Sequence, residues 1–177
     1  MNTNLESLNQ LINQAKSYHQ NGNLIEARRL YLQALNLSPN NDDVYNFLGI
    51  TYSQLNNHEQ SIKCLNKAIE INPNNPNYYI SLAETLLIKG DLKQSIKNLY
   101  QAIKLNPNLP TAHFNLANTL KLDKKYQGAI KHYQKAIMLD PNHLAAHNNL
   151  ANTYAQHLQY AKAMDSYNNV LRLKPDF

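Results

Sequence analysis

The sequence has no tryptophan, one cysteine and four glycines among its 177 residues. The single cysteine, Cys64, excludes a disulfide within the chain and is typical of a reducing compartment. The glycines stand apart from one another, so no glycine-rich loop of the kind that cradles a phosphate is present. No stretch approaches the roughly 18 apolar residues of a membrane-spanning helix. These scarcities argue against a disulfide scaffold, a P-loop and a membrane span.

The net charge of the chain is also small. The chain has 17 lysines and arginines against 12 aspartates and glutamates, a formal net charge of +5. Nucleic-acid-binding domains are usually more basic, with the charge on one face, so we do not expect nucleic acid as the main partner. The opening MNTNLESLNQ lacks the cationic and apolar regions of a signal peptide. We therefore expect a cytoplasmic protein.

The few prolines are placed regularly. Five of the seven are spaced 34 residues apart, and the other two, also 34 apart, each follow a member of the first set by three residues. They are Pro39, Pro73, Pro107, Pro141 and Pro175, with Pro76 and Pro110. Proline is excluded from a helix interior but tolerated in its first turn. Punctuation at one fixed period of this length predicts a stacked array of repeats.

Aligned on these prolines, the chain divides into an extension, residues 1–7, and five repeats: 8–41, 42–75, 76–109, 110–143 and 144–177. Position 8 of each repeat is small and position 24 is large. Position 8 is Ala15, Gly49, Ala83, Ala117 and Ala151, and position 24 is Tyr31, Leu65, Leu99, Tyr133 and Tyr167. Apolar residues recur at intervals of three, four and seven, as on one face of a helix. Each repeat is therefore predicted to be helix, tight turn, helix.

The fullest copy of the pattern runs Tyr45, Leu48, Gly49 and Tyr52, followed by Ser61, Leu65, Ala68 and Pro73. This pattern resembles the tetratricopeptide repeat (TPR), and the resemblance covers residues 8–177. It implies an all-α, right-handed superhelical solenoid of five repeats. It also implies that the first helix of each pair lines a concave groove in which a partner protein binds.

The histidines are the first candidates for chemistry. His113 and His147 both occupy position 4, where the family has a packing aromatic residue, so we interpret them as packing residues. A zinc site needs three or four converging ligands, and Cys64 lies two repeats away from His113. No acid pair or nucleophile–base pair stands out. The sequence therefore predicts no catalytic residue, no metal site and no cofactor.

Asparagines gather at groove positions of the last two repeats: Asn115, Asn118, Asn149 and Asn152. An asparagine amide both donates and accepts hydrogen bonds, so such a row could hold the backbone of an extended peptide. The arrangement resembles the asparagine ladder of protein O-linked N-acetylglucosamine transferase, and the strings 113–118 and 147–152 look like that subfamily and its bacterial transferase relatives. The alternative is that a general bias toward asparagine places some of these residues there.

Apolar residues occupy other groove positions: Phe47, Ile50, Ile80 and Phe114. They could form a patch that takes a helix or an apolar side chain of a partner. Alternatively, they fold down between adjacent first helices. One binding mode of the family is not expected, because the lysines and asparagines with which co-chaperone repeats hold a C-terminal carboxylate are missing. Ile12, Lys16 and Phe47 stand at the first of those positions.

The sequence stops where a sixth repeat would begin, with no polar capping helix. We expect either that the natural protein continues or that the uncapped fifth repeat self-associates. The function predicted is a non-catalytic protein–protein interaction module that binds a peptide or helix in its groove. The alternatives are the N-terminal substrate-recognition arm of a larger glycosyltransferase or sulfotransferase, and a secretion chaperone or effector.

Overall fold

The computed structural model describes residues 2–174, with side chains from residue 6 onward, and over this range the chain forms ten helices and no strand. The all-α class predicted from the sequence is confirmed. The chain divides into two compact units, residues 1–89 and 90–177. Within residues 2–174 no helix is long and apolar enough to cross a bilayer.

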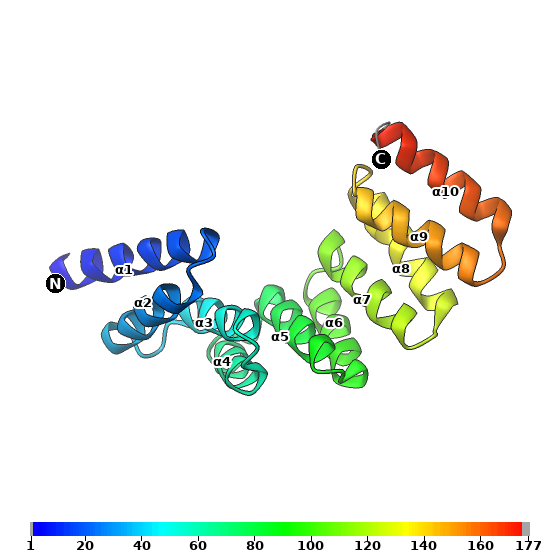
Figure 1. Cartoon of the computed structure of the whole chain (residues 1–177). Helices are drawn as coiled ribbons and strands as arrows, with labels where there is room; N and C mark the ends of the chain where they lie inside the picture. Colours follow the sequence, from blue (N-terminus) through cyan, green and yellow to red (C-terminus); the bar gives the residue numbers. More distant parts are fainter. Residues whose placement is uncertain (1, 175–177) are drawn as a thin grey trace. The chain divides into compact units, whose positions relative to one another are not determined.

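The first unit contains five helices: α1 (Asn2–Gln20), α2 (Leu24–Leu37), α3 (Asp42–Gln54), α4 (His58–Ile71) and α5 (Pro76–Ile88). Two hairpins, α1 with α2 and α3 with α4, follow each other along the chain (Figure 1). The second helix of each hairpin packs against the next first helix, α2 on α3 and α4 on α5, and α3 also contacts α5. The first helices α1, α3 and α5 therefore succeed one another on the same side.

The second unit begins with the second helix of the third repeat, α6 (Leu92–Leu105), and continues with α7 (Pro110–Leu122), α8 (Tyr126–Leu139), α9 (Leu144–Gln156) and α10 (Tyr160–Leu173). Helices α7 and α8 form one hairpin and α9 and α10 another (Figure 1). Helix α6 packs against α7, α8 packs against α9, and the first helices α7 and α9 are in contact.

Helix starts follow the proline pattern. Helices α5 and α7 begin at Pro76 and Pro110, where the missing proline N–H removes no helical hydrogen bond. Helices α3, α5, α7 and α9 all start at the first residue of a predicted repeat. Residues 2–7, expected to precede the first repeat, continue α1 toward the N-terminus instead.

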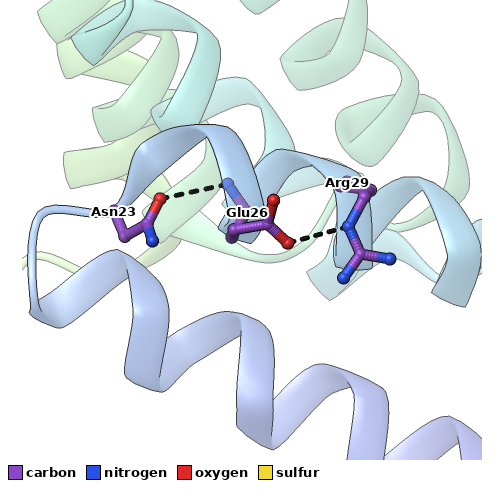
Figure 2. A network of polar contacts seen from close by, with 3 residues as sticks. All are labelled: Asn23, Glu26 and Arg29. Atoms are coloured by element: carbon purple, nitrogen blue, oxygen red, sulfur yellow. Dashed lines mark hydrogen bonds and ion pairs between the residues drawn. The ribbon is translucent and has the colours of Figure 1, made fainter.

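Many asparagines cap helices. The side chains of Asn23, Asn41 and Asn57 each accept a hydrogen bond from the backbone N–H three residues later. Figure 2 shows the first of these caps: Asn23 accepts from the N–H of Glu26, whose carboxylate in turn accepts from Arg29 Nε at 2.8 Å. A cap satisfies one of the donors that a helix N-terminus leaves open. Part of the asparagine content therefore belongs to the turns.

The two helices of a repeat touch at positions 8 and 24. A Cβ added to Gly49 would lie 2.6 Å from Leu65 Cγ and 3.3 Å from the carbonyl oxygen of Ser61. In the first repeat, Ala15 and Tyr31 are both fully buried in the core that also contains Leu48. The small residue at position 8 thus allows the close approach that the sequence pattern predicts.

The turn inside every repeat uses the same backbone conformation. Position 15 has positive φ in all five repeats: Gly22 (76°), Asn56 (59°), Gly90 (85°), Lys124 (58°) and Leu158 (58°). Glycine adopts this left-handed conformation freely, and asparagine tolerates it. A leucine is strained in this conformation, and because the Leu158 side chain is 72% exposed, its packing contacts do not offset the strain energy.

We expect Leu158→Gly to stabilise the second unit by about 0.5–1 kcal/mol, because the strain is relieved and little buried surface is lost. The reciprocal change, Gly22→Ala in the first unit, should destabilise by a similar amount, although its Cβ would meet no atom within 4 Å. Urea unfolding followed by circular dichroism measures both. A Leu158→Gly variant that unfolds at lower urea than the wild type contradicts the assignment.

Candidate functional site

The predicted binding residues fall in both units. Phe47, Ile50 and Ile80 belong to the first, and Phe114 with the four asparagines belongs to the second. They form two candidate surfaces, one in each unit. The asparagine surface consists of Asn115, Asn118, Asn149 and Asn152 on α7 and α9. The repeat-1 pocket is lined by Lys16, His19, Gln20, Tyr31, Phe47 and Ile50.

On the asparagine surface, the structure joins Asn118 and Asn149 directly. The Asn118 side-chain oxygen accepts one hydrogen bond from Asn149 Nδ2 at 2.9 Å and another from the Tyr133 hydroxyl at 2.5 Å. In the next repeat, Asn152 accepts the hydroxyl of Tyr167 at 2.5 Å in the same way. Position 24 of the second helix thus reaches across to position 9 of the first.

These hydrogen bonds orient the amides. With the oxygens of Asn118 and Asn152 occupied, each amide has its nitrogen left as a donor, and among residues 6–174 no partner is found for either nitrogen. Asn118 and Asn152 are half-buried, so their amides still meet solvent. The surface therefore offers fixed N–H donors, which suit carbonyl oxygens.

Phe114 borders this surface and serves in packing. Its ring centroid lies 4.6 Å from that of His143 and 6.0 Å from that of Tyr133, and the side chain remains half-buried. The residue therefore fills space between α7 and its neighbours while keeping one edge at the surface. Its contacts agree with the packing interpretation, and its role in a partner-binding patch stays a prediction.

The repeat-1 pocket has a volume of about 360 Å³ and is formed by α1, α2 and α3. The Phe47 ring stacks on Tyr31, with centroids 5.8 Å apart and planes 14° from parallel. The Lys16 ammonium lies over the Phe47 ring, 4.6 Å from its centroid. Such a cation–π contact is favourable and holds Lys16 at the pocket. Phe47 and Ile50, both half-buried, form the apolar walls.

Ile80 behaves differently from Phe47 and Ile50. Its side chain is only 7% exposed, so it packs within the protein, as the second interpretation of the apolar positions describes. An amphipathic pattern does not distinguish these cases, because Ile80 and Phe47 both lie next to the main packing positions of their helices. Only the contacts of the folded chain separate them.

The tyrosine at position 24 of the first repeat has no hydrogen-bond partner. Tyr31 is fully buried and its hydroxyl is unpaired, whereas Tyr133 donates to an asparagine at position 9. In the first repeat position 9 is Lys16, a donor that cannot accept. Burial raises the pKa of Tyr31 to about 12, so the hydroxyl keeps its proton. Comparing positions 9 and 24 across repeats would have revealed this difference in the sequence, but neither Lys16 nor Tyr31 was predicted as a site residue.

His19 completes the polar side of the pocket. The Thr51 hydroxyl donates to the carbonyl oxygen of Phe47 at 2.7 Å, so the 3.1 Å contact between Thr51 Oγ1 and His19 Nδ1 requires the proton on Nδ1. Burial lowers the pKa of His19, against a smaller opposing effect of Gln54. The neutral form of the imidazole is therefore favoured.

The position-4 histidines make a structural hydrogen bond. His113 Nε2 donates to the Pro107 carbonyl and His147 Nε2 to the Pro141 carbonyl, each at 3.0 Å. The tyrosine at position 4 of the third repeat, Tyr79, donates to the carbonyl oxygen of Pro73 at the same distance. This shared hydrogen bond supports the packing interpretation and gives a reason for histidine to replace the aromatic residue.

His113 also contacts a second histidine. With Nε2 carrying the proton, His113 Nδ1 accepts from His132 Nδ1 at 3.0 Å, and the two rings stack at 5.3 Å. Burial, followed by the nearby charges of His113 and Lys131, lowers the pKa of His132 to about 4. Within residues 6–174 no group of three or more potential ligands is placed to hold a metal ion.

Two other surfaces belong to the second helices of the repeats. Their basic residues are partly neutralised, since Arg29 pairs with Glu26 at 2.8 Å and Lys67 with Glu70 at 2.9 Å. Helix α10 exposes Tyr160, Met164 and Leu171 by 62%, 66% and 48%. Self-association of the fifth repeat, expected because the sequence shows no capping helix, stays a prediction.

Comparisons with known families agree with the fold. Five family models described as tetratricopeptide repeat or TPR repeat match residues 6–74, 64–97, 83–124, 110–143 and 144–177. Together they span residues 6–177 without a gap. No curated protein matches the chain.

Several solved structures share the fold. PilF of Pseudomonas aeruginosa has a TM-score of 0.88 at 19% identity, covering 96% of this chain and 78% of its own. MamA from Desulfovibrio magneticus RS-1 has a TM-score of 0.83 at 19% identity, covering 96% of both chains. YrrB, described as a TPR protein with an unusual peptide-binding site, has a TM-score of 0.73 at 23% identity, covering 94% and 86%.

The two tyrosine environments predict opposite effects of one substitution. Tyr133→Phe should destabilise by about 0.5–1.5 kcal/mol, because it removes the hydrogen bond to Asn118. Tyr31→Phe should be neutral or stabilising, because the lost hydroxyl is buried and unpaired. Thermal unfolding of both variants checks this. Equal destabilisation by the two changes would contradict the assigned partners.

The histidine pair predicts acid sensitivity. The pKa of His132 is about 4 in the folded chain and about 6.5 when unfolded. Between these values the unfolded state binds more protons, so stability falls as pH decreases from about 6.5 to 4. His132→Gln should reduce this fall. Melting temperatures of wild type and variant at pH 7 and pH 5 measure the effect, and an unchanged pH dependence would rule out His132 as its source.

Proposed function

Because the chain belongs to the tetratricopeptide repeat family and has its protein-interaction fold, we propose that it is a non-catalytic module that binds a peptide or helix of a partner protein. Within each unit, binding uses the face formed by the first helices of its repeats. In the first unit the contact residues are Phe47 and Ile50, with the rest of the repeat-1 pocket. In the second unit they are Phe114 and the asparagine surface.

One observation carries the proposal. The Tyr133 and Tyr167 hydroxyls hold the oxygens of Asn118 and Asn152, which leaves an oriented amide nitrogen on each of two successive first helices. Oriented donors at the interval of a structural repeat suit the carbonyl oxygens of an extended backbone, whatever its side chains. Because tyrosines of the second helices hold these amides in place, less conformational freedom is lost on binding.

Two further points support this proposal. The asparagine-ladder resemblance to O-linked N-acetylglucosamine transferase concerns the same positions, and a ladder there would bind an extended peptide. YrrB, which shares the fold, is described as having a peptide-binding site. Ile80, being 7% exposed, contributes to the packing beneath the surface rather than to the contact.

The test begins with a displayed library of random linear peptides, selected on the full chain. Binding of an enriched peptide is then measured by fluorescence anisotropy for the wild type and for Asn149→Ala/Asn152→Ala. We expect the dissociation constant to rise about 2- to 10-fold for each lost hydrogen bond. The variant should remain folded, because Asn118 keeps its hydrogen bond from Tyr133 when Asn149 is removed, and Tyr167 is 36% exposed, so its hydroxyl can bond to water.

The matched control is Asn168→Ala, an exposed asparagine on the second helix α10. It should leave the affinity unchanged. If no peptide is enriched, or if the control weakens binding as much as the double variant does, recognition by the asparagine surface is wrong.

A further inference from the structure

The repeat-1 pocket contains hydrogen-bond donors without acceptors. The Tyr31 hydroxyl is buried and unpaired, and the side chain is 0% exposed. The Lys16 ammonium lies over the Phe47 ring, and no carboxylate among residues 6–174 forms an ion pair with it. An unpaired buried hydroxyl is costly, and a native protein that retains one needs a reason.

The other repeats show that this cost is avoidable. Where position 24 is tyrosine in the fourth and fifth repeats, Asn118 and Asn152 at position 9 accept its hydroxyl. In the second repeat, position 24 is Leu65, which has no polar atom to satisfy. The first repeat alone combines a tyrosine with a lysine at position 9, so two donors meet at one pocket and the intramolecular acceptor is missing.

The chemistry of the pocket defines its occupant. The donors need an acceptor, and the Lys16 charge favours an anionic one. Tyr31 lines the pocket and its hydroxyl is buried, while Phe47 and Ile50 form apolar walls, so an acceptor at the tip of a side chain with apolar methylenes suits the pocket. His19, held in its neutral form, adds no second positive charge. A glutamate side chain meets these requirements.

We propose that the repeat-1 pocket binds a glutamate side chain of the partner peptide. Its carboxylate accepts the Tyr31 hydroxyl and pairs with Lys16, while its methylenes lie against Phe47 and Ile50. This inference rests on the proposed peptide-binding function and adds the acidic residue that the partner carries. The donors differ from those of the co-chaperone carboxylate clamp, which the sequence lacks.

The experiment uses peptides enriched from the random library on the full chain. Each is resynthesised with an amidated C-terminus, in one version with its glutamate and in another with glutamine at that place. For the wild type, the change to glutamine should weaken binding about tenfold or more, as expected for the loss of a charge-assisted hydrogen bond. For Lys16→Met and Tyr31→Phe, the two peptide versions should differ much less.

Two controls isolate the effect. Lys63→Met, on the exposed side of α4, changes the net charge equally and should retain the full preference for glutamate. Tyr31→Phe also removes an unpaired hydroxyl, so its melting temperature should equal or exceed that of the wild type.

Three results overturn the inference while leaving peptide binding intact: enriched peptides without glutamate, an equal glutamine effect in wild type and both pocket variants, or loss of binding on amidation. The last would assign the acceptor to a C-terminal carboxylate. A library that yields no binding peptide contradicts the proposed function, and this inference with it.

Discussion

The structure depends on one close contact between the two helices of a repeat. A small residue at position 8 of the first helix lies beneath a large one at position 24 of the second, so close in the second repeat that a Cβ on Gly49 would lie 2.6 Å from Leu65. This approach brings position 24 to the neighbouring position 9, as the hydrogen bond from Tyr133 to Asn118 shows. The packing contact therefore reaches the face on which we place recognition.

That coupling explains why the repeats differ in chemistry while keeping one fold. Leucine at position 24 makes the contact and adds no hydrogen bond. Tyrosine makes the same contact and adds a hydroxyl. In the fourth and fifth repeats this hydroxyl orients Asn118 and Asn152. In the first repeat, where Lys16 occupies position 9, the Tyr31 hydroxyl is unpaired. The choice of residues at positions 9 and 24 thus sets whether a repeat presents a neutral amide donor or a charged pocket.

Much of the fold follows directly from the sequence. Pro76 and Pro110 begin helices because a helix tolerates proline only in its first turn. The small residues at position 8 mark the contact between the two helices of a repeat. Gly22 and Gly90 mark the turns, since position 15 has positive φ in every repeat. Lys124 and Leu158 give no such signal, and their turns are recognised only from the period of the other three.

The site was less predictable, for physical reasons. Phe47 and Ile80 look alike in a helical pattern, and only three-dimensional contacts leave one partly exposed and bury the other. The groove asparagines were identified by position, but their orientation depends on tyrosines 15 residues away in the chain. His113 and His147 were interpreted as packing residues, but their hydrogen bonds to proline carbonyls are seen only in the folded structure.

The most direct test of the account is a crystal structure of the chain with a library-selected peptide bound. The account predicts that the peptide lies along first helices and that its backbone carbonyl oxygens accept hydrogen bonds from the side-chain nitrogens of Asn118 or Asn152. A peptide bound to the outer face of α8 or α10, with these amides still exposed to solvent, would contradict recognition by the first helices.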